Sequence, residues 1–245
     1  MSEIAKFFAE VTGNIAGLRA DRDVQALSRI WLREIARHKY AYNFTWLGRP
    51  LIQLPQDMVA VQELVWAVKP DLIIETGVAH GGSLIYSASL LELIGGAGRV
   101  IGVDIDIRAH NRVEIEKHPL ARRIQLIQGS SVDRGVIRQV REAARGCERV
   151  MVLLDSNHTH KHVLQELRGY SPMVTKGSYL VVFDTLIEDM PGDLIKDRPW
   201  GKGNNPKTAV WEFLKKNRRF AVDKDVEAKL LLTVAPDGYL KCIAD

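Results

Sequence analysis

The sequence contains few cysteines and no long apolar run. Its 245 residues include two cysteines, Cys147 and Cys242, and neither lies in a metal-binding or redox motif. Two cysteines in a chain of this length are typical of reduced thiols rather than of a disulfide framework. The N-terminal residues lack the basic start and apolar core of a signal peptide, and no stretch reaches the roughly 20 apolar residues of a membrane span. We therefore expect a cytoplasmic protein with no membrane span.

An excess of charge of one sign is also absent. The 34 lysines and arginines nearly balance the 30 aspartates and glutamates, and the basic residues are spread along the chain. The pI is near 9.0, but nucleic-acid-binding surfaces usually show clustered basic residues, so we expect no nucleic-acid partner. With 46% apolar and 26% charged residues, the chain can bury one sizeable core.

Short apolar runs alternate with helical patterns from residue 70 onward. Because they are continuous and end in glycine, serine or acidic residues, five of these runs predict buried parallel strands. They are DLIIETG (71–77), GRVIGVDID (98–106), IQLIQGSS (124–131), RVMVLLDS (149–156) and GSYLVVFDT (177–185). Residues 220–243 predict an antiparallel hairpin with the turn APDG between its strands. The pattern indicates an α/β fold with a Rossmann-like open sheet, mostly parallel, with a C-terminal antiparallel hairpin.

The first 40 residues show apolar side chains at helical spacing. They predict two amphipathic helices, followed by an aromatic, proline-broken segment (40–57) that we expect to be an ordered loop. We divide the chain into an N-terminal helical extension, 1–45, and an α/β domain, 46–245. The extension carries more apolar residues than a short segment needs, so we expect a homo-oligomer that assembles through it.

The loop after the first predicted strand, ETGVAHGGS, lacks the G-x-G-x-x-G pattern. Gly77 permits a tight turn, and Gly81 and Gly82 allow a ligand to approach the backbone at a helix start. The missing pattern disfavours a dinucleotide pyrophosphate site. Glu75 would repel a phosphate but suits an ammonium group. The loop therefore indicates a cationic ligand.

Acidic and small residues end the next two predicted strands. Asp104 follows the second strand, where an acid can bond ribose hydroxyls. Ser131 follows the third strand, where it could line an adenine pocket. S-adenosylmethionine is a cationic, ribose-bearing ligand without phosphates. The alternative is that the glycines only form turns and the acids only cap helices.

The stretch MVLLDSNHTHKHV (151–163) places three histidines after an aspartate. They could be zinc ligands, a general base beside a metal-binding aspartate, or the polar start of a helix. No H-E-x-x-H pattern supports zinc. Asp155 and Asp184, which follow the fourth and fifth strands, offer hard oxygen ligands suited to Mg²⁺ or Mn²⁺. His158 lies in the loop and can act as a general base, whereas we assign His160 and His162 to the following helix.

Four segments together resemble the cephalosporin hydroxylase family. They are KPDLIIETGVAHGGS, LDSNHTHKHVLQEL, GSYLVVFDT and DGYLKCI, and the resemblance covers about residues 37–243. The family consists of class I S-adenosylmethionine-dependent O-methyltransferases and includes rhamnosyl and macrolide-sugar O-methyltransferases. The resemblance implies an O-methyltransferase with a divalent ion such as Mg²⁺. It also implies an acceptor hydroxyl on a sugar, a nucleotide-sugar or polysaccharide, or a natural product.

The resemblance also implies roles for individual residues. It assigns methionine binding to the loop of Glu75, Gly77, Gly81 and Ser83, the ribose to Asp104, and the adenine side to Ser131. It assigns the metal to Asp155 and Asp184, with Asp155 also beside the cofactor, and general-base catalysis to His158.

One departure from the family pattern concerns the metal site. Many members have Glu-Asp where this chain has Phe183–Asp184. Glu188, Asp189 or water could replace the missing ligand, or metal binding is weaker or lost.

A loop rich in glycine and asparagine, RPWGKGNNP (198–206), has the composition of a mobile lid. Its Trp200 could stack on a sugar ring. Two other functions stay open. One is a hydroxylase or oxidoreductase, as the family name suggests, although the chain lacks a pyrophosphate loop and a convincing 2-His-1-carboxylate arrangement. The other is a non-catalytic partner that binds S-adenosylmethionine and supports another enzyme.

Overall fold

The computed structural model describes residues 1–194 and 196–245. These residues form a seven-stranded sheet in the order β5-β4-β3-β6-β7-β9-β8. The strands are β3 (Leu72–Thr76), β4 (Arg99–Asp104), β5 (Ile124–Gln128), β6 (Val150–Leu154), β7 (Tyr179–Val182), β8 (Phe220–Val222) and β9 (Tyr239–Cys242). Strands β3 to β7 are parallel, and β9 runs antiparallel to both of its neighbours. The predicted open, mostly parallel sheet is confirmed.

Helices cover both faces of the sheet. Because β3, β6 and β7 are buried along their whole length, they carry apolar residues at nearly every position rather than an alternating pattern. One face packs against α3 (Pro55–Val68), α4 (Gly82–Ile94), α5 (Ala109–Lys117) and α9 (Lys224–Leu230). The other packs against α6 (Arg134–Ala143), α7 (His160–Tyr170) and α8 (Pro206–Lys216). Short 3-10 helices lie at η2 (Ala121–Arg123), η3 (Ser171–Met173), η4 (Thr185–Asp189) and η5 (Gly192–Leu194).

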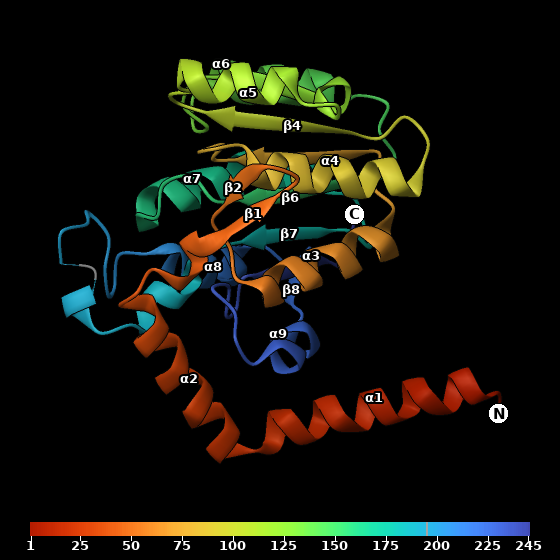
Figure 1. Cartoon of the computed structure of the whole chain (residues 1–245), viewed down its shortest axis with the longest axis vertical. Helices are drawn as coiled ribbons and strands as arrows, with labels where there is room; N and C mark the ends of the chain where they lie inside the picture. The colour runs from red at the N-terminus through yellow and green to blue at the C-terminus, as the bar shows by residue number, and fades with distance from the viewer. Residues whose placement is uncertain (195) are drawn as a thin grey trace.

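The two predicted N-terminal helices are present as α1 (Glu3–Ala20) and α2 (Arg22–Ala36). Figure 1 shows α1 as an arm that runs alongside the domain with its N-terminus at the free end. It contacts α9, where Arg19 forms an ion pair with Asp225, but none of its residues is buried. In the described part of the chain, no helix combines the length and the apolar character that crossing a membrane requires.

The segment expected to be a loop after these helices is more regular. It forms the 3-10 helix η1 (Tyr40–Asn43) and the two-stranded hairpin of β1 (Phe44–Trp46) and β2 (Arg49–Leu51). Leu47 and Gly48 both have positive φ, 45° and 86°, as the two-residue turn of a tight hairpin requires. Leucine rarely adopts this conformation, so the local sequence did not reveal the hairpin.

The C-terminal hairpin was predicted with the wrong connection. Strands β8 and β9 are antiparallel neighbours, but the helix α9 lies between them, because the Asp223 side chain caps the backbone N–H groups of Asp225 and Val226. The turn APDG leads into β9 instead of joining the two strands.

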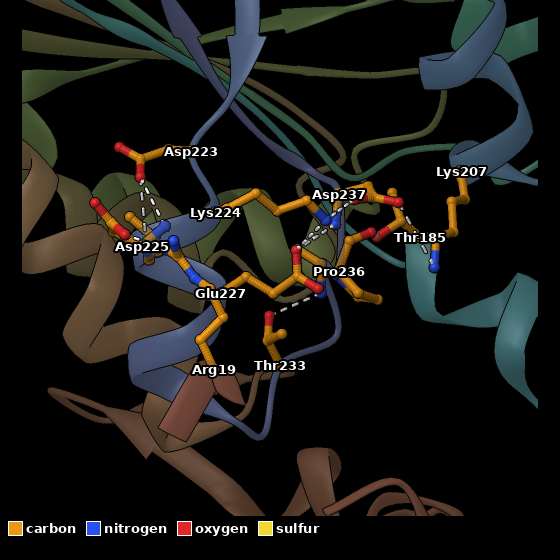
Figure 2. A network of polar contacts seen from close by, with 12 residues as sticks. Arg19, Thr185, Lys207, Asp223, Lys224, Asp225, Glu227, Thr233, Pro236 and Asp237 are labelled. Atoms are coloured by element: carbon orange, nitrogen blue, oxygen red, sulfur yellow. Dashed lines mark hydrogen bonds and ion pairs between the residues drawn. The ribbon is translucent and has the colours of Figure 1, made fainter. Parts of the chain in front are cut away.

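Contacts from three elements hold this turn (Figure 2). Thr185 of η4 donates a hydrogen bond to the Pro236 carbonyl at 2.5 Å. Lys224 of α9 and Lys207 of α8 both approach Asp237. The turn is therefore held by long-range contacts that local sequence does not reveal.

Candidate active site

A pocket of about 280 Å³ opens at the carboxyl edge of the sheet. Its floor comes from the loops after β3, β6 and β7, which meet because the carboxyl ends of parallel neighbours share one edge. The lining residues with polar side chains include Tyr42, Gln53, His80, Ser83, Asp155, Ser156, His158 and Asp184. With Val234, the pocket therefore brings together residues from five separate parts of the sequence.

Asp155, His158 and Asp184 form one cluster in this pocket. Each offers a ligand atom, and these atoms all lie within 4.8 Å of one another. Asp155 follows β6 and Asp184 follows β7, whose last residues Leu154 and Val182 pair in register. Asp184 has a φ of 56°, a conformation that non-glycine residues adopt rarely and that is enriched at functional sites. The structure thus unites the two predicted metal ligands and the predicted base.

The charges of this cluster fit a divalent cation. Burial, and next the carboxylates of Asp184 and Glu75, hold the pKa of Asp155 well above its usual range. A carboxyl group in this position favours its ionised form only when positive charge is nearby. Two carboxylates with one imidazole are a donor set that accepts Mg²⁺ or Mn²⁺. The residues present therefore fit the metal that the sequence predicts.

The predicted lid reaches His158. The rings of His158 and Trp200 pack edge to face, with centroids 4.7 Å apart. The guanidinium of Arg198 lies 5.4 Å from the Trp200 ring. The loop that contains Trp200 therefore packs against the candidate base, although none of residues 198–206 lines the pocket.

The two acids considered as substitute ligands lie outside the cluster. Glu188 accepts hydrogen bonds from the backbone N–H of Gly203, at 2.8 Å, and from the side-chain amide of Asn205. Asp189 pairs with Lys207 at 2.6 Å. Both acids hold the lid loop and α8 in place, so neither replaces the ligand that is missing at Phe183.

The glycine loop after β3 carries a buried acid with an unused oxygen. Glu75 is 2% exposed, and one of its oxygens accepts a hydrogen bond from the Ser83 hydroxyl. The other oxygen has no partner among the described residues. Burial raises the pKa of Glu75 to about 8, although the Ser83 hydrogen bond opposes the shift. An unpaired buried carboxylate oxygen is costly, and Glu75 is not among the residues that line the pocket.

Two glycines bring this loop close to its neighbours. Gly77 has a φ of 92°, and a Cβ atom there would lie 2.0 Å from the carbonyl oxygen of Asp155. Gly81 also has a positive φ, 82°, and a Cβ atom there would meet Ile115 at 2.4 Å. Any side chain at Gly77 would push this loop away from Asp155.

Asp104 and Ser131 lie at the edge of the sheet but already have partners. One oxygen of Asp104 accepts the backbone N–H of Val78 at 2.8 Å, and the other accepts that of Asp106 at 3.0 Å. The Ser131 hydroxyl contacts Nε2 of His162 at 2.9 Å. Neither residue lines the pocket beside the cluster, so both hold loops next to it.

The other two histidines belong to α7, as predicted. His160 contacts Thr208 and Glu212 of α8 at 2.8 and 3.1 Å. His162 bridges Ser131 and Ser156. Sequence reasoning missed Tyr42, Gln53 and Val234, which line the pocket but follow no recognisable motif.

Comparisons with known proteins show what the chain is similar to. A family model described as Rhamnosyl O-methyltransferase/CmcI matches residues 38–243. A rhamnosyl O-methyltransferase of Mycobacterium tuberculosis (strain ATCC 25618 / H37Rv) is 30% identical over 214 residues, which cover 83% of this chain and 82% of the relative. One of Mycobacterium leprae (strain TN) is 32% identical over 163 residues, which cover 63% and 68% of the two chains.

Solved structures share the fold at lower identity. CmcI with Mg and SAM has a TM-score of 0.58 at 19% identity, over 83% of this chain and 78% of that chain. An O-methyltransferase from Bacillus cereus in complex with SAH has a TM-score of 0.52 at 15% identity, over 79% and 81%. The match over residues 38–243 shows that this chain belongs to the rhamnosyl O-methyltransferase/CmcI family.

Proposed function

We propose that this chain is an S-adenosylmethionine-dependent, divalent-metal-assisted O-methyltransferase that acts on a sugar hydroxyl. The observation that carries the proposal is the Asp155–His158–Asp184 cluster, which shares one pocket with the loop that follows Glu75. The mycobacterial relatives are named rhamnosyl O-methyltransferases, and CmcI has been solved with Mg and SAM. These names support the reaction class and the cofactors.

The cofactor site has the residues that the methionine end needs. Glu75 offers an unpaired buried oxygen to the ammonium group, and Gly77, Gly81 and Ser83 shape the loop beside it. Asp155 contributes negative charge next to this loop. A carboxylate has about four acceptor positions, so Asp104 keeps capacity for ribose hydroxyls while it holds Val78 and Asp106. We assign Ser131, which follows β5, to the adenine side.

The residues of the cluster can support proton removal from an alcohol. When bound, S-adenosylmethionine supplies an electrophilic methyl group, and Mg²⁺ or Mn²⁺ at Asp155 and Asp184 lowers the pKa of a hydroxyl group. His158 is the nitrogen base of the cluster and accepts the proton. The Asp184 carboxylate faces Nε2 of His158 at 3.3 Å and stabilises the imidazolium that forms.

We assign acceptor binding to segments outside the sheet. Trp200, packed on His158, offers an aromatic face on which a sugar ring can stack. The acceptor is a small molecule or a glycan whose ring carries several hydroxyls. The extension, 1–45, lies beside the catalytic domain, 46–245, and contributes Ala41 and Tyr42 to the pocket.

A redox function has less support than methyl transfer. Iron oxygenases use two histidines and one carboxylate, whereas the cluster in the described residues contains one histidine and two carboxylates. A non-catalytic role has less support too, because the cluster brings two metal ligands and a base together. Methyl transfer therefore explains the residues best.

We also propose a cytoplasmic homo-oligomer. Ile4, Phe7 and Phe8 on α1 are more than half exposed. Ile4, Phe8, Val11, Ile15 and Leu18 follow the 4-3-4-3 spacing of a helix-pairing seam. Leu27, Ile30 and Trp31 expose a second apolar stripe on α2. A second copy of this chain would cover these surfaces.

Two measurements test the function. Calorimetry should show S-adenosylmethionine binding, and NAD and 2-oxoglutarate should not bind. Radiolabelled methyl should pass from S-adenosylmethionine to at least one member of a panel of rhamnosides, and transfer should require Mg²⁺ or Mn²⁺. Binding of NAD or 2-oxoglutarate without methyl transfer would reject the proposal.

A further inference from the structure

Gln53 is a buried polar residue that faces the active-site pocket without a protein partner. It is 6% exposed and lines the pocket. Its side-chain amide forms no hydrogen bond with the residues that the structure describes, and neither amide atom is fully buried. An accessible amide that no protein group pairs with can bind water or a ligand. Gln53 is therefore free to pair with a ligand in the pocket.

The segment that carries Gln53 lines the pocket, together with Pro50 and Ile52. At one end, the Pro50 backbone packs against the start of α4. A Cβ atom on Gly82 would lie 2.1 Å from the Pro50 carbonyl oxygen. At the other end, Asp57 accepts the Val234 backbone N–H at 2.9 Å and the Tyr239 hydroxyl at 2.6 Å. Gln53 lies between these two anchors. Its backbone is therefore held from both sides.

The contact of Asp57 with Val234 lies on the metal side of the pocket. Val234 accepts a hydrogen bond from the backbone N–H of Leu186 at 3.1 Å, two residues after Asp184, and it lines the pocket itself. Asp57 also accepts a hydrogen bond from the Thr233 hydroxyl. Thr233 lies beside the turn drawn in Figure 2. The segment thus leads from the cofactor loop toward the strand ends that carry Asp184.

The chemistry of an amide matches an acceptor sugar. The side chain of glutamine donates through its NH₂ group and accepts through its carbonyl oxygen, and two neighbouring sugar hydroxyls can satisfy both. The cofactor's methionine end presents an ammonium group and a carboxylate, and we assign the ammonium group to Glu75. The carboxylate that is left only accepts hydrogen bonds, so it would leave the amide oxygen of Gln53 unpaired. A vicinal diol is the better partner.

We propose that Gln53 is a specificity-determining residue that holds the non-reacting hydroxyls of the acceptor sugar. This inference rests on the proposed methyl transfer to a sugar. Tyr42, which is half exposed, lines the same pocket from η1. Gln53 selects acceptors that present a hydroxyl next to the one that is methylated.

The test compares three variants with the wild-type protein. Gln53→Leu removes donor and acceptor at similar volume, and Gln53→Glu keeps the shape but loses the NH₂ donors. Gln62→Leu, on the exposed side of α3, is the matched control. The substrates are p-nitrophenyl α-L-rhamnopyranoside and analogues that each lack one ring hydroxyl. S-adenosylhomocysteine affinity is measured by calorimetry on each protein.

Gln53→Leu should lower kcat/KM for the full rhamnoside about tenfold or more, as expected when a buried polar group loses its partner. One deoxy analogue should lower kcat/KM of the wild type by a similar factor and have little further effect on Gln53→Leu, because the two changes remove the same interaction. S-adenosylhomocysteine affinity should stay within about twofold. Gln62→Leu should behave like the wild type.

Two outcomes overturn the inference. One is an unchanged kcat/KM in Gln53→Leu, and the other is a loss of S-adenosylhomocysteine affinity that accounts for the whole effect. If the wild type methylates no rhamnoside, the proposed function fails separately. Saturation-transfer NMR with L-rhamnose on the S-adenosylhomocysteine-loaded protein then decides the role of Gln53. Signal lost in Gln53→Leu supports the inference, and no signal in the wild type, or equal signal in both, overturns it.

Discussion

Nε2 of His158 lies 3.3 Å from Oδ2 of Asp184. The two residues follow different strands, β6 and β7, and the contact joins the candidate base to a candidate metal ligand. Asp155 lies close enough to complete a group of three ligand atoms. His158 is therefore positioned either to accept a proton or to join the metal shell, and separate experiments distinguish these roles.

The metal site is tested by removing the ion and one ligand. EDTA should abolish methyl transfer, and Mg²⁺ or Mn²⁺ should restore it. Mn²⁺ should also raise the Tm of the wild type, because a ligand that binds the native state stabilises it. Asp155→Ala should lose both the Tm response and activity. Full activity in EDTA would instead mean that this chain, with Phe183 in place of a ligand, works without the metal.

The general base is tested by His158→Ala. This variant should keep cofactor and Mn²⁺ binding but lose rate by about 10²–10⁴-fold, the usual contribution of a positioned base. Its activity should partly recover at high pH, where the acceptor loses its proton more easily. His160→Ala, which breaks contacts to α8 only, is the control and should keep its rate while losing about 1 kcal/mol of stability. Loss of Mn²⁺ binding in His158→Ala would make His158 a ligand.

The ribose acid is tested by Asp104→Ala. Removing a charged hydrogen-bond acceptor should weaken S-adenosylmethionine binding by about 1.5–3 kcal/mol. Calorimetry measures the affinity, and circular dichroism checks the fold because Asp104 also holds Val78 and Asp106. An unchanged affinity in a folded variant would remove Asp104 from the cofactor site.

The pKa of Glu75 predicts how the stability of the ligand-free protein depends on pH. Burial raises this pKa from 4.5 to about 8, so between these values the native state binds a proton that the unfolded state has lost. Stability should therefore fall as pH rises through this window, by on the order of 4 kcal/mol from this group. Glu75→Gln should remove this part of the slope in denaturant titrations at pH 5, 6, 7 and 8. An identical slope in both proteins would contradict the burial of an unpaired carboxyl group.

The N-terminal helices predict assembly. Deleting residues 1–30 removes the exposed apolar side chains of α1 and part of α2, and should reduce the mass measured by light scattering to that of smaller species. Phe8→Glu should act in the same direction without a deletion, whereas the exposed polar change Asn14→Ser should not. A monomeric full-length protein would refute assembly through these helices.

The sequence alone determined the sheet and the chemistry at its edge. Apolar runs such as LIIET and VMVLL indicate strands that are buried on both faces of a parallel sheet. The residues that follow such strands meet at the carboxyl edge of the sheet. Glu75, Asp155 and Asp184 each directly follow or end such a run. Their proximity follows from the strand pattern, without any knowledge of side-chain packing.

Only the tertiary structure decided which residues close the pocket. Gln53 and Val234 belong to segments that are distant in sequence, and they share the pocket because Asp57 is buried against the C-terminal turn. The same long-range packing directs Glu188 and Asp189 to the lid and α8 instead of the metal cluster, and engages Ser131 with His162. Periodicity reports whether a residue is buried, but the partner of a buried polar group depends on how distant segments pack against one another.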